Sequence, residues 1–148
     1  LGAFNDAFIT YPVSRYDLKG KRLLKSQQKI YLADPGMRTA IAGRQPGPEF
    51  GHILENIVYL ELRRRYTNVW VGKANAYEVD FVAQDKNGYI EYFQVALTLR
   101  DSEVLQRELR ALRGIPDVNP RYLLCFDPEE AVYDGIKQLN LLNWLLAD

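Results

Sequence analysis

Cysteine, histidine and methionine each occur only once in this sequence of 148 residues. A single cysteine, Cys125, excludes an internal disulfide, and with His52 as the only histidine a thiolate zinc site is excluded too. Cys125 lies in the apolar run RYLLCFD, which favours a buried and inert thiol. No apolar run approaches the roughly 20 residues that span a bilayer, so no membrane span is predicted.

A net charge is also missing, because 19 basic residues balance 19 acidic ones. A domain that mainly coats nucleic acid needs a net basic surface, so that class is disfavoured, although a local basic patch is left open. The phosphate-loop pattern GxxxxGK[ST] does not occur, so this chain is not expected to bind ATP itself. The chain begins at Leu1 and its only methionine is Met37, which predicts a piece of a longer polypeptide, and the single cysteine favours the cytoplasm.

What the sequence does contain is an alternation of strand and helix patterns, which predicts one α/β (α+β) domain over residues 1–148. Short strands and a short helix at 35–42 are expected within 1–45, and the core within 46–148. Apolar periodicity predicts that helices 49–65 and 102–113 flank a mixed central sheet. The expected strands of this sheet are 68–73, 77–84, 89–98 and 120–126, followed by a final strand and short helix.

Two of these strands carry acids or amides next to each other. Asn87-Gly88 is a tight-turn signal, so strands 77–84 and 89–98 should be antiparallel neighbours. Strict alternation places Glu78 and Asp80 on one face of their strand and Val79 and Phe81 on the other. The same rule places Gln94 and Ala96 together, and Glu91 on the opposite face.

The chemistry that this layout suggests is metal-dependent phosphodiester hydrolysis. Such a site needs clustered oxygen ligands for a divalent ion, and a lysine that stabilises the transition state. Glu55 on the long helix and Asp80 on the first hairpin strand fit the ligand positions. Gln94 stands where a further acid is needed, and Ala96 where the lysine is needed. Lys73 is a candidate replacement for that lysine.

A structural role for the same residues is left open. Inward-pointing acids on a helix and a strand can pair with neighbouring cations, and Arg63, Arg64 or Lys73 are the candidates. Under that interpretation the acids hold the fold together and bind no ion.

Four stretches carry a resemblance to a known family: YPVSRYDLKGKRLLKSQQKIYLADPGMR, GHILENIVYLELRRR, EVDFVAQ and YFQVALTLRD. Together they resemble the C-terminal domain of uncharacterised function found in bacterial and archaeal AAA-type ATP-binding proteins. That domain is related to the PD-(D/E)xK nuclease superfamily. The resemblance extends from about Tyr11 to Asp148 and implies a restriction-endonuclease-like fold.

The resemblance assigns roles to four residues. It makes Glu55 the helix acid, Asp80 the metal-binding acid, Glu78 its neighbour and Gln94 the third-motif position, with Mg²⁺ or Mn²⁺ as the implied ion. It implies an upstream ATPase module, outside this chain, that binds ATP and is the main partner. The departures at Gln94 and Ala96 predict a degenerate site that serves the ATPase by binding DNA or protein. An active nuclease with an unusual Gln-x-Ala motif is the alternative, and a homo-oligomer is left open.

Overall fold

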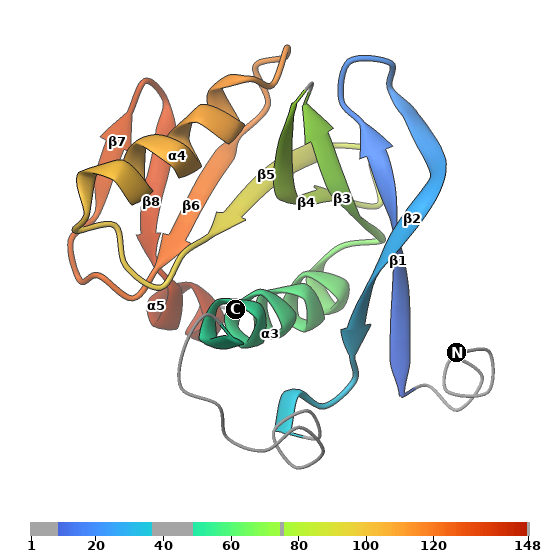
Figure 1. Cartoon of the computed structure of the whole chain (residues 1–148), viewed down its shortest axis with the longest axis horizontal. Helices are drawn as coiled ribbons and strands as arrows, with labels where there is room; N and C mark the ends of the chain where they lie inside the picture. The colour runs from blue at the N-terminus through green and yellow to red at the C-terminus, as the bar shows by residue number, and fades with distance from the viewer. Residues whose placement is uncertain (1–8, 37–48, 75, 148) are drawn as a thin grey trace.

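The computed structural model describes residues 9–36, 49–74 and 76–147. Eight strands of this part form one mixed sheet in the order β2-β1-β3-β4-β5-β6-β8-β7 (Figure 1). The strands are β1 Thr10–Asp17, β2 Arg22–Leu32, β3 Asn68–Ala74, β4 Tyr77–Gln84, β5 Ile90–Val95, β6 Arg121–Cys125, β7 Ala131–Tyr133 and β8 Ile136–Asn140. The predicted mixed sheet is confirmed, and β7 is the strand that the sequence analysis did not anticipate.

Helices cover both faces of this sheet, as predicted (Figure 1). The helix α3 (Glu49–Arg65) packs on one face through Leu54, Val58 and Leu62, and α5 (Leu141–Leu146) packs on the same face. The helix α4 (Ser102–Arg113) packs on the other face through Leu109 and Leu112. Their spacing of three or four residues puts these apolar side chains on one side of each helix, which is why the helices are amphipathic.

Polar side chains fix where two of the helices begin. Asp101 accepts a hydrogen bond from the backbone N–H of Glu103 at 2.8 Å, and Asn140 accepts one from Asn143 at 3.0 Å. Each cap satisfies a backbone donor that has no partner within its own helix. Of the expected short helix at 35–42, only 35–36 are among the described residues and are helical, and the remainder lies outside them.

The hairpin of β4 and β5 is antiparallel, which confirms the turn prediction. Its loop closes through the N–H of Gly88, which donates to the carbonyl of Asp85 at 3.2 Å, and Asp85 also accepts from the N–H of Asn87 and of Tyr89. Gly88 has a φ of 88°, which a glycine adopts without strain. The hairpin sets β5 beside β4 and so brings Gln94 near Asp80.

The N-terminal hairpin of β1 and β2 belongs to the same sheet as the rest of the chain. Strand β1 pairs antiparallel with β2 and parallel with β3, where Arg15 faces Val71. The two expected portions, 1–45 and 46–148, therefore share one sheet in the described structure. Among the described residues, the structure contains no helix with the length and apolar character needed to cross a membrane.

A β-bulge interrupts β4 where the sequence analysis placed its acids. The register between β3 and β4 is broken between two facing pairs, Trp70–Val82 and Gly72–Val79. Between them β3 has one residue and β4 has two, Asp80 and Phe81. A bulge re-aims the side chains that follow it, and bulges are frequent beside active sites.

Gly72 makes this bulge compact, so Gly72→Ala should destabilise the protein. A Cβ at this position would lie 2.9 Å from the Cβ of Val79 and 2.9 Å from Cγ2 of Val82, and both valines are fully buried. We expect a loss of about 1–3 kcal/mol in the free energy of unfolding, measured by urea denaturation.

Gly51→Ala is the matched control for Gly72→Ala. Gly51 lies in α3 with no atom within 4 Å of an added Cβ, so the substitution should stabilise the protein by about 0.5–1 kcal/mol. If Gly72→Ala proved as stable as the parent protein, the close packing at the bulge would be wrong.

Candidate functional site

The bulge changes which face of β4 the predicted site residues occupy. Val79 packs in the core beneath α4, whereas Phe81 packs in the core beneath α3. The prediction that Val79 and Phe81 share a face is therefore wrong. Glu78 and Asp80 nevertheless both act on the charge of Lys29. Alternation assumes a regular pleat, and the extra residue at Asp80 breaks it.

Strands β4 and β5 separate at the bulge, and two side chains fill the separation. Their paired register ends at Phe81 and Phe93. Beyond that point Oδ2 of Asp80 accepts a hydrogen bond from the N–H of Val95 at 2.8 Å. In return, Oε1 of Gln94 accepts one from the N–H of Asp80 at 3.1 Å. These bonds replace the backbone ladder that the split strands no longer form, so the sequence-predicted pair does meet.

Glu55 faces the same region from α3 and is held by two donors. It is buried, and its Oε1 accepts from the hydroxyl of Tyr31 and pairs with the amine of Lys29. Both donors come from β2, where period-two spacing puts them on one face. His52 lies one turn before, with Nδ1 at 3.8 Å from Oε2 of Glu55, and its side chain is mostly exposed.

Glu78 completes a group of alternating charges around Lys29. Its Oε1 lies 3.2 Å from Nζ of Lys29, and its Oε2 lies 3.0 Å from the guanidinium of Arg15 on β1. The acids thus pair with cations of the N-terminal hairpin. The candidates named from sequence were different: Arg64 pairs with Glu61, and Lys73 lines a separate hollow beside Asp17.

The pKa values show how strongly these groups interact. Burial raises the pKa of Asp80 well above its ordinary value, and the carboxylate of Glu55 raises it further. Burial alone would lower the pKa of Lys29, but Glu55, Asp80 and Glu78 together hold it above its usual value. These shifts favour the charged form of Lys29 and oppose the charged form of Asp80, and Lys29 and Arg15 face Glu55 and Glu78.

Gln94 makes its remaining contact on the opposite face of the sheet. Its Nε2 donates to Oε2 of Glu108, a buried acid of α4, at 2.8 Å, and Arg107 donates to the other oxygen of Glu108 at 2.7 Å. Gln94 and Ala96 both face α4, which agrees with their predicted shared face. Glu91 bonds Tyr66 and Tyr122 on the α3 side, also as predicted. Glu55 and Gln94 consequently approach Asp80 from different faces.

A divalent ion does not fit these residues as they are arranged. Within 9–36, 49–74 and 76–147, no three side chains of histidine, cysteine, aspartate or glutamate come together as a metal site. The contacts give the reason, since protein donors already occupy Oε1 of Glu55, Oδ2 of Asp80 and Oε1 of Gln94. Mg²⁺ and Mn²⁺ need several free oxygen ligands, and here an ammonium group takes the central position.

The sequence analysis missed Lys29, Tyr31, Arg15 and Glu108. Lys29 and Tyr31 stand two residues apart in the strand-like run KIYLAD, so their shared face was readable. What no local pattern shows is that β2 lies against α3. Nothing in the sequence of α4 distinguishes the buried Glu108 from an acid exposed to solvent.

Two relatives are similar to this chain over much of its length. An uncharacterised protein of Haemophilus influenzae is 35% identical over 147 residues, which is 99% of this chain and 36% of that protein. The uncharacterised protein MJ1544 of Methanocaldococcus jannaschii is 32% identical over 112 residues, which is 73% of this chain and 24% of that protein. The chain therefore spans about a third or less of these curated relatives. No family model and no solved structure matches it.

Proposed function

We propose that this chain is the nuclease-like C-terminal domain of an AAA-type ATP-binding protein, with a restriction-endonuclease-like fold and a site that no longer hydrolyses phosphodiesters. In this proposal the domain works in the cytoplasm and serves the ATPase by binding DNA or protein. The upstream module, outside this chain, binds ATP and is the main partner.

One observation supports the proposed loss of catalysis. The amine of Lys29 lies between Glu55 and Glu78, where a nuclease would need a metal ion. It pairs with Glu55 and with Glu78, and its pKa stays above its ordinary value. An internal cation neutralises the acids permanently, whereas a nuclease needs them free to hold a dication. Gln94 adds no charge, and its carbonyl oxygen is engaged by the N–H of Asp80.

The nuclease-like ancestry is supported by the shape of the site. A helix acid, Glu55, faces an antiparallel hairpin whose strands separate at Asp80 and Gln94. A bulge and a buried acid with a raised pKa are unfavourable for stability and are expected where a functional site once required them. The lengths of the relatives, which extend far beyond the matched part, support a further module in the parent protein.

The alternative of an active nuclease has one observation in its favour. The nuclease pattern needs a lysine at the position that Ala96 occupies. Lys29 of β2 could replace it, because it lies beside Glu55 and Glu78. For catalysis, however, the ion would have to displace Lys29 from both acids first. We therefore keep this activity as the second candidate.

The nuclease assay is the direct test. Supercoiled plasmid and single-stranded DNA are incubated with the protein in Mg²⁺ or Mn²⁺, beside Asp80→Ala. We expect no cleavage by either protein, because two electrostatic groups are missing and loss of one such group alone slows reactions by about 10²–10³-fold.

The matched control for this assay is Asp134→Asn, an exposed acid in the turn before β8. Metal-dependent cleavage that persists in Asp134→Asn and disappears in Asp80→Ala would overturn the degenerate site and establish the active nuclease. Lys29→Met would then show whether Lys29 is its catalytic lysine.

A further inference from the structure

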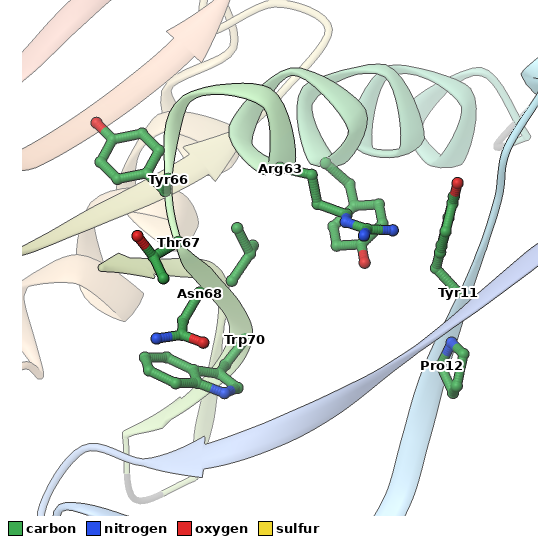
Figure 2. A pocket seen from close by; sticks show the side chains of 9 residues that line it. Tyr11, Pro12, Arg63, Tyr66, Thr67, Asn68 and Trp70 are labelled. Atoms are coloured by element: carbon green, nitrogen blue, oxygen red, sulfur yellow. The ribbon is translucent and has the colours of Figure 1, made fainter. Parts of the chain in front are cut away.

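A second site lies at the other end of α3, in a pocket of about 360 Å³. Three segments meet there: the start of β1, the last turns of α3, and the connection into β3 (Figure 2). Figure 2 shows Arg63 extending from the helix toward Tyr11, with Asn68 beside the indole of Trp70. This volume is at the lower end of the usual range for small-ligand sites, about 300–1,000 Å³, so it suits a single small group.

Arg63 brings a positive charge to this pocket. Its neighbours in the last turn are engaged elsewhere, since Arg64 pairs with Glu61 at 2.8 Å and Arg65 pairs with it at 2.5 Å. Arg63 instead lies over the ring of Tyr11, with its guanidinium carbon 4.1 Å from the ring centroid. Within the described ranges no carboxylate pairs with Arg63, and its side chain is exposed. It is therefore open to an anion.

Aromatic rings form the walls of the pocket and are held in place by neighbours. On the α4 side of the sheet the indole of Trp70 stacks on Tyr16 with ring centroids 5.2 Å apart, and on the α3 side the ring of Tyr59 lies 6.1 Å from that of Tyr11. Burial raises the pKa of Tyr59. Arg63, which hydrogen-bonds the Tyr59 hydroxyl, lowers this pKa in part. Rings that are already fixed lose little conformational entropy when a planar ligand stacks on them. A flat, anionic group is the ligand that these walls and this cation would bind.

We propose that the pocket binds one nucleotide of a single-stranded nucleic acid, with its base against the aromatic wall and its phosphate on Arg63. Base stacking on fixed rings combined with an arginine at the phosphate is the usual arrangement in single-strand binding. The proposal rests on the proposed function as a binding domain and names the ligand for this pocket.

A peptide fits the polar lining of this pocket less well than a base does. Peptides commonly add to an open strand edge or lay a helix into an apolar groove. At the pocket β1 pairs only with β2 and β3 only with β4, because the parallel pairing of β1 with β3 is confined to Arg15–Asp17 and Val71–Lys73. An extended peptide is therefore the competing occupant that the test must exclude. The lining also includes the polar side chains of Thr67 and Asn68, which suit the edge of a base.

Fluorescence anisotropy with a short fluorescein-labelled oligothymidylate tests the proposal. We expect the parent protein to bind and Arg63→Ala to bind at least about tenfold more weakly, which is the usual worth of a charge-assisted hydrogen bond to phosphate. The slope of log K against log salt should fall by about 0.7 in Arg63→Ala, as for one lost phosphate contact on a single strand.

Arg64→Ala is the matched control, because it removes the same charge from the adjacent exposed position and leaves the pocket intact. It should bind as the parent protein does. A second readout is tryptophan fluorescence: the oligonucleotide should quench it in the parent protein and much less in Trp70→Phe, which keeps a stacking ring and still binds by anisotropy. Thermal unfolding of each variant shows that the fold is retained.

Equal weakening by Arg63→Ala and Arg64→Ala would mean that only overall charge matters and would overturn the pocket assignment. No binding of the oligonucleotide, or Arg63-dependent binding of a labelled acidic peptide in its place, would also overturn it. These outcomes are independent of the nuclease assay, since Arg63 lies eight residues from Glu55, about 12 Å along α3.

Discussion

Lys29→Met should lower the free energy of unfolding by about 3 kcal/mol at neutral pH. The side chain of Lys29 is only 24% exposed, and it is the partner shared by Glu55 and Glu78. Removing one partner of a buried pair leaves the others uncompensated, which is why such substitutions destabilise proteins strongly. The measurement is urea denaturation at several pH values, and the deficit should shrink as the pH falls toward about 4, where carboxylates take up protons.

Two further variants make this result specific. Lys25→Met, an exposed lysine of the same strand, should change the stability by less than about 0.5 kcal/mol. The double variant Lys29→Met with Glu55→Gln should recover part of the loss, because it removes a charge that Lys29 had balanced. Mn²⁺ should raise the melting temperature of Lys29→Met and not that of the parent protein. A neutral effect of Lys29→Met would mean that the acids do not depend on it.

Asp80→Asn should stabilise the protein at neutral pH, by about 1–2 kcal/mol. Burial and the nearby carboxylate of Glu55 raise the pKa of Asp80, so the folded protein keeps a proton on this group to higher pH than the unfolded chain does. With a raised folded pKa, stability falls as the pH rises from about 4, the ordinary aspartate value, toward the folded pKa. An asparagine removes this dependence and still offers an oxygen to the N–H of Val95.

Asp80→Ala is the informative comparison for this prediction. It removes the same carboxyl group but leaves the N–H of Val95 without its side-chain acceptor, so it should be less stable than Asp80→Asn. Both proteins are compared with the parent by thermal unfolding across the pH range. If Asp80→Asn were instead destabilised at neutral pH, Asp80 would be charged in the folded protein and its raised pKa would be wrong.

Local sequence signals were sufficient for the elements of the core. Apolar periodicity predicted α3 and α4, and Asn87-Gly88 marked the β4–β5 hairpin, all of which the structure contains. Each of these signals acts within a few residues of chain. The three-residue strand β7 was missed because so short a segment has no readable period.

The site was predictable only in part. Alternation on β5 correctly put Gln94 on the face of Ala96 and Glu91 on the other, since β5 has a regular pleat there. The same rule failed on β4 because of the bulge at Asp80. A glycine within a strand, Gly72, was the available sign of that bulge. The pairing of Lys29 with Glu55 joins distant parts of the chain, and no local pattern reports such a contact.

The parallel pairing of β1 with β3 has a consequence for how the protein is made. During synthesis the β1–β2 hairpin leaves the ribosome long before β3. Strand β1 therefore cannot pair with β3, where Arg15 faces Val71, until β3 has also been made. A lone two-stranded hairpin is only marginally stable in water, and non-local pairing is slow. Until it docks, Glu55 and Glu78 lack their partners Lys29 and Arg15. Assembly of the nascent chain should therefore be completed by this docking, with the charged cluster forming last.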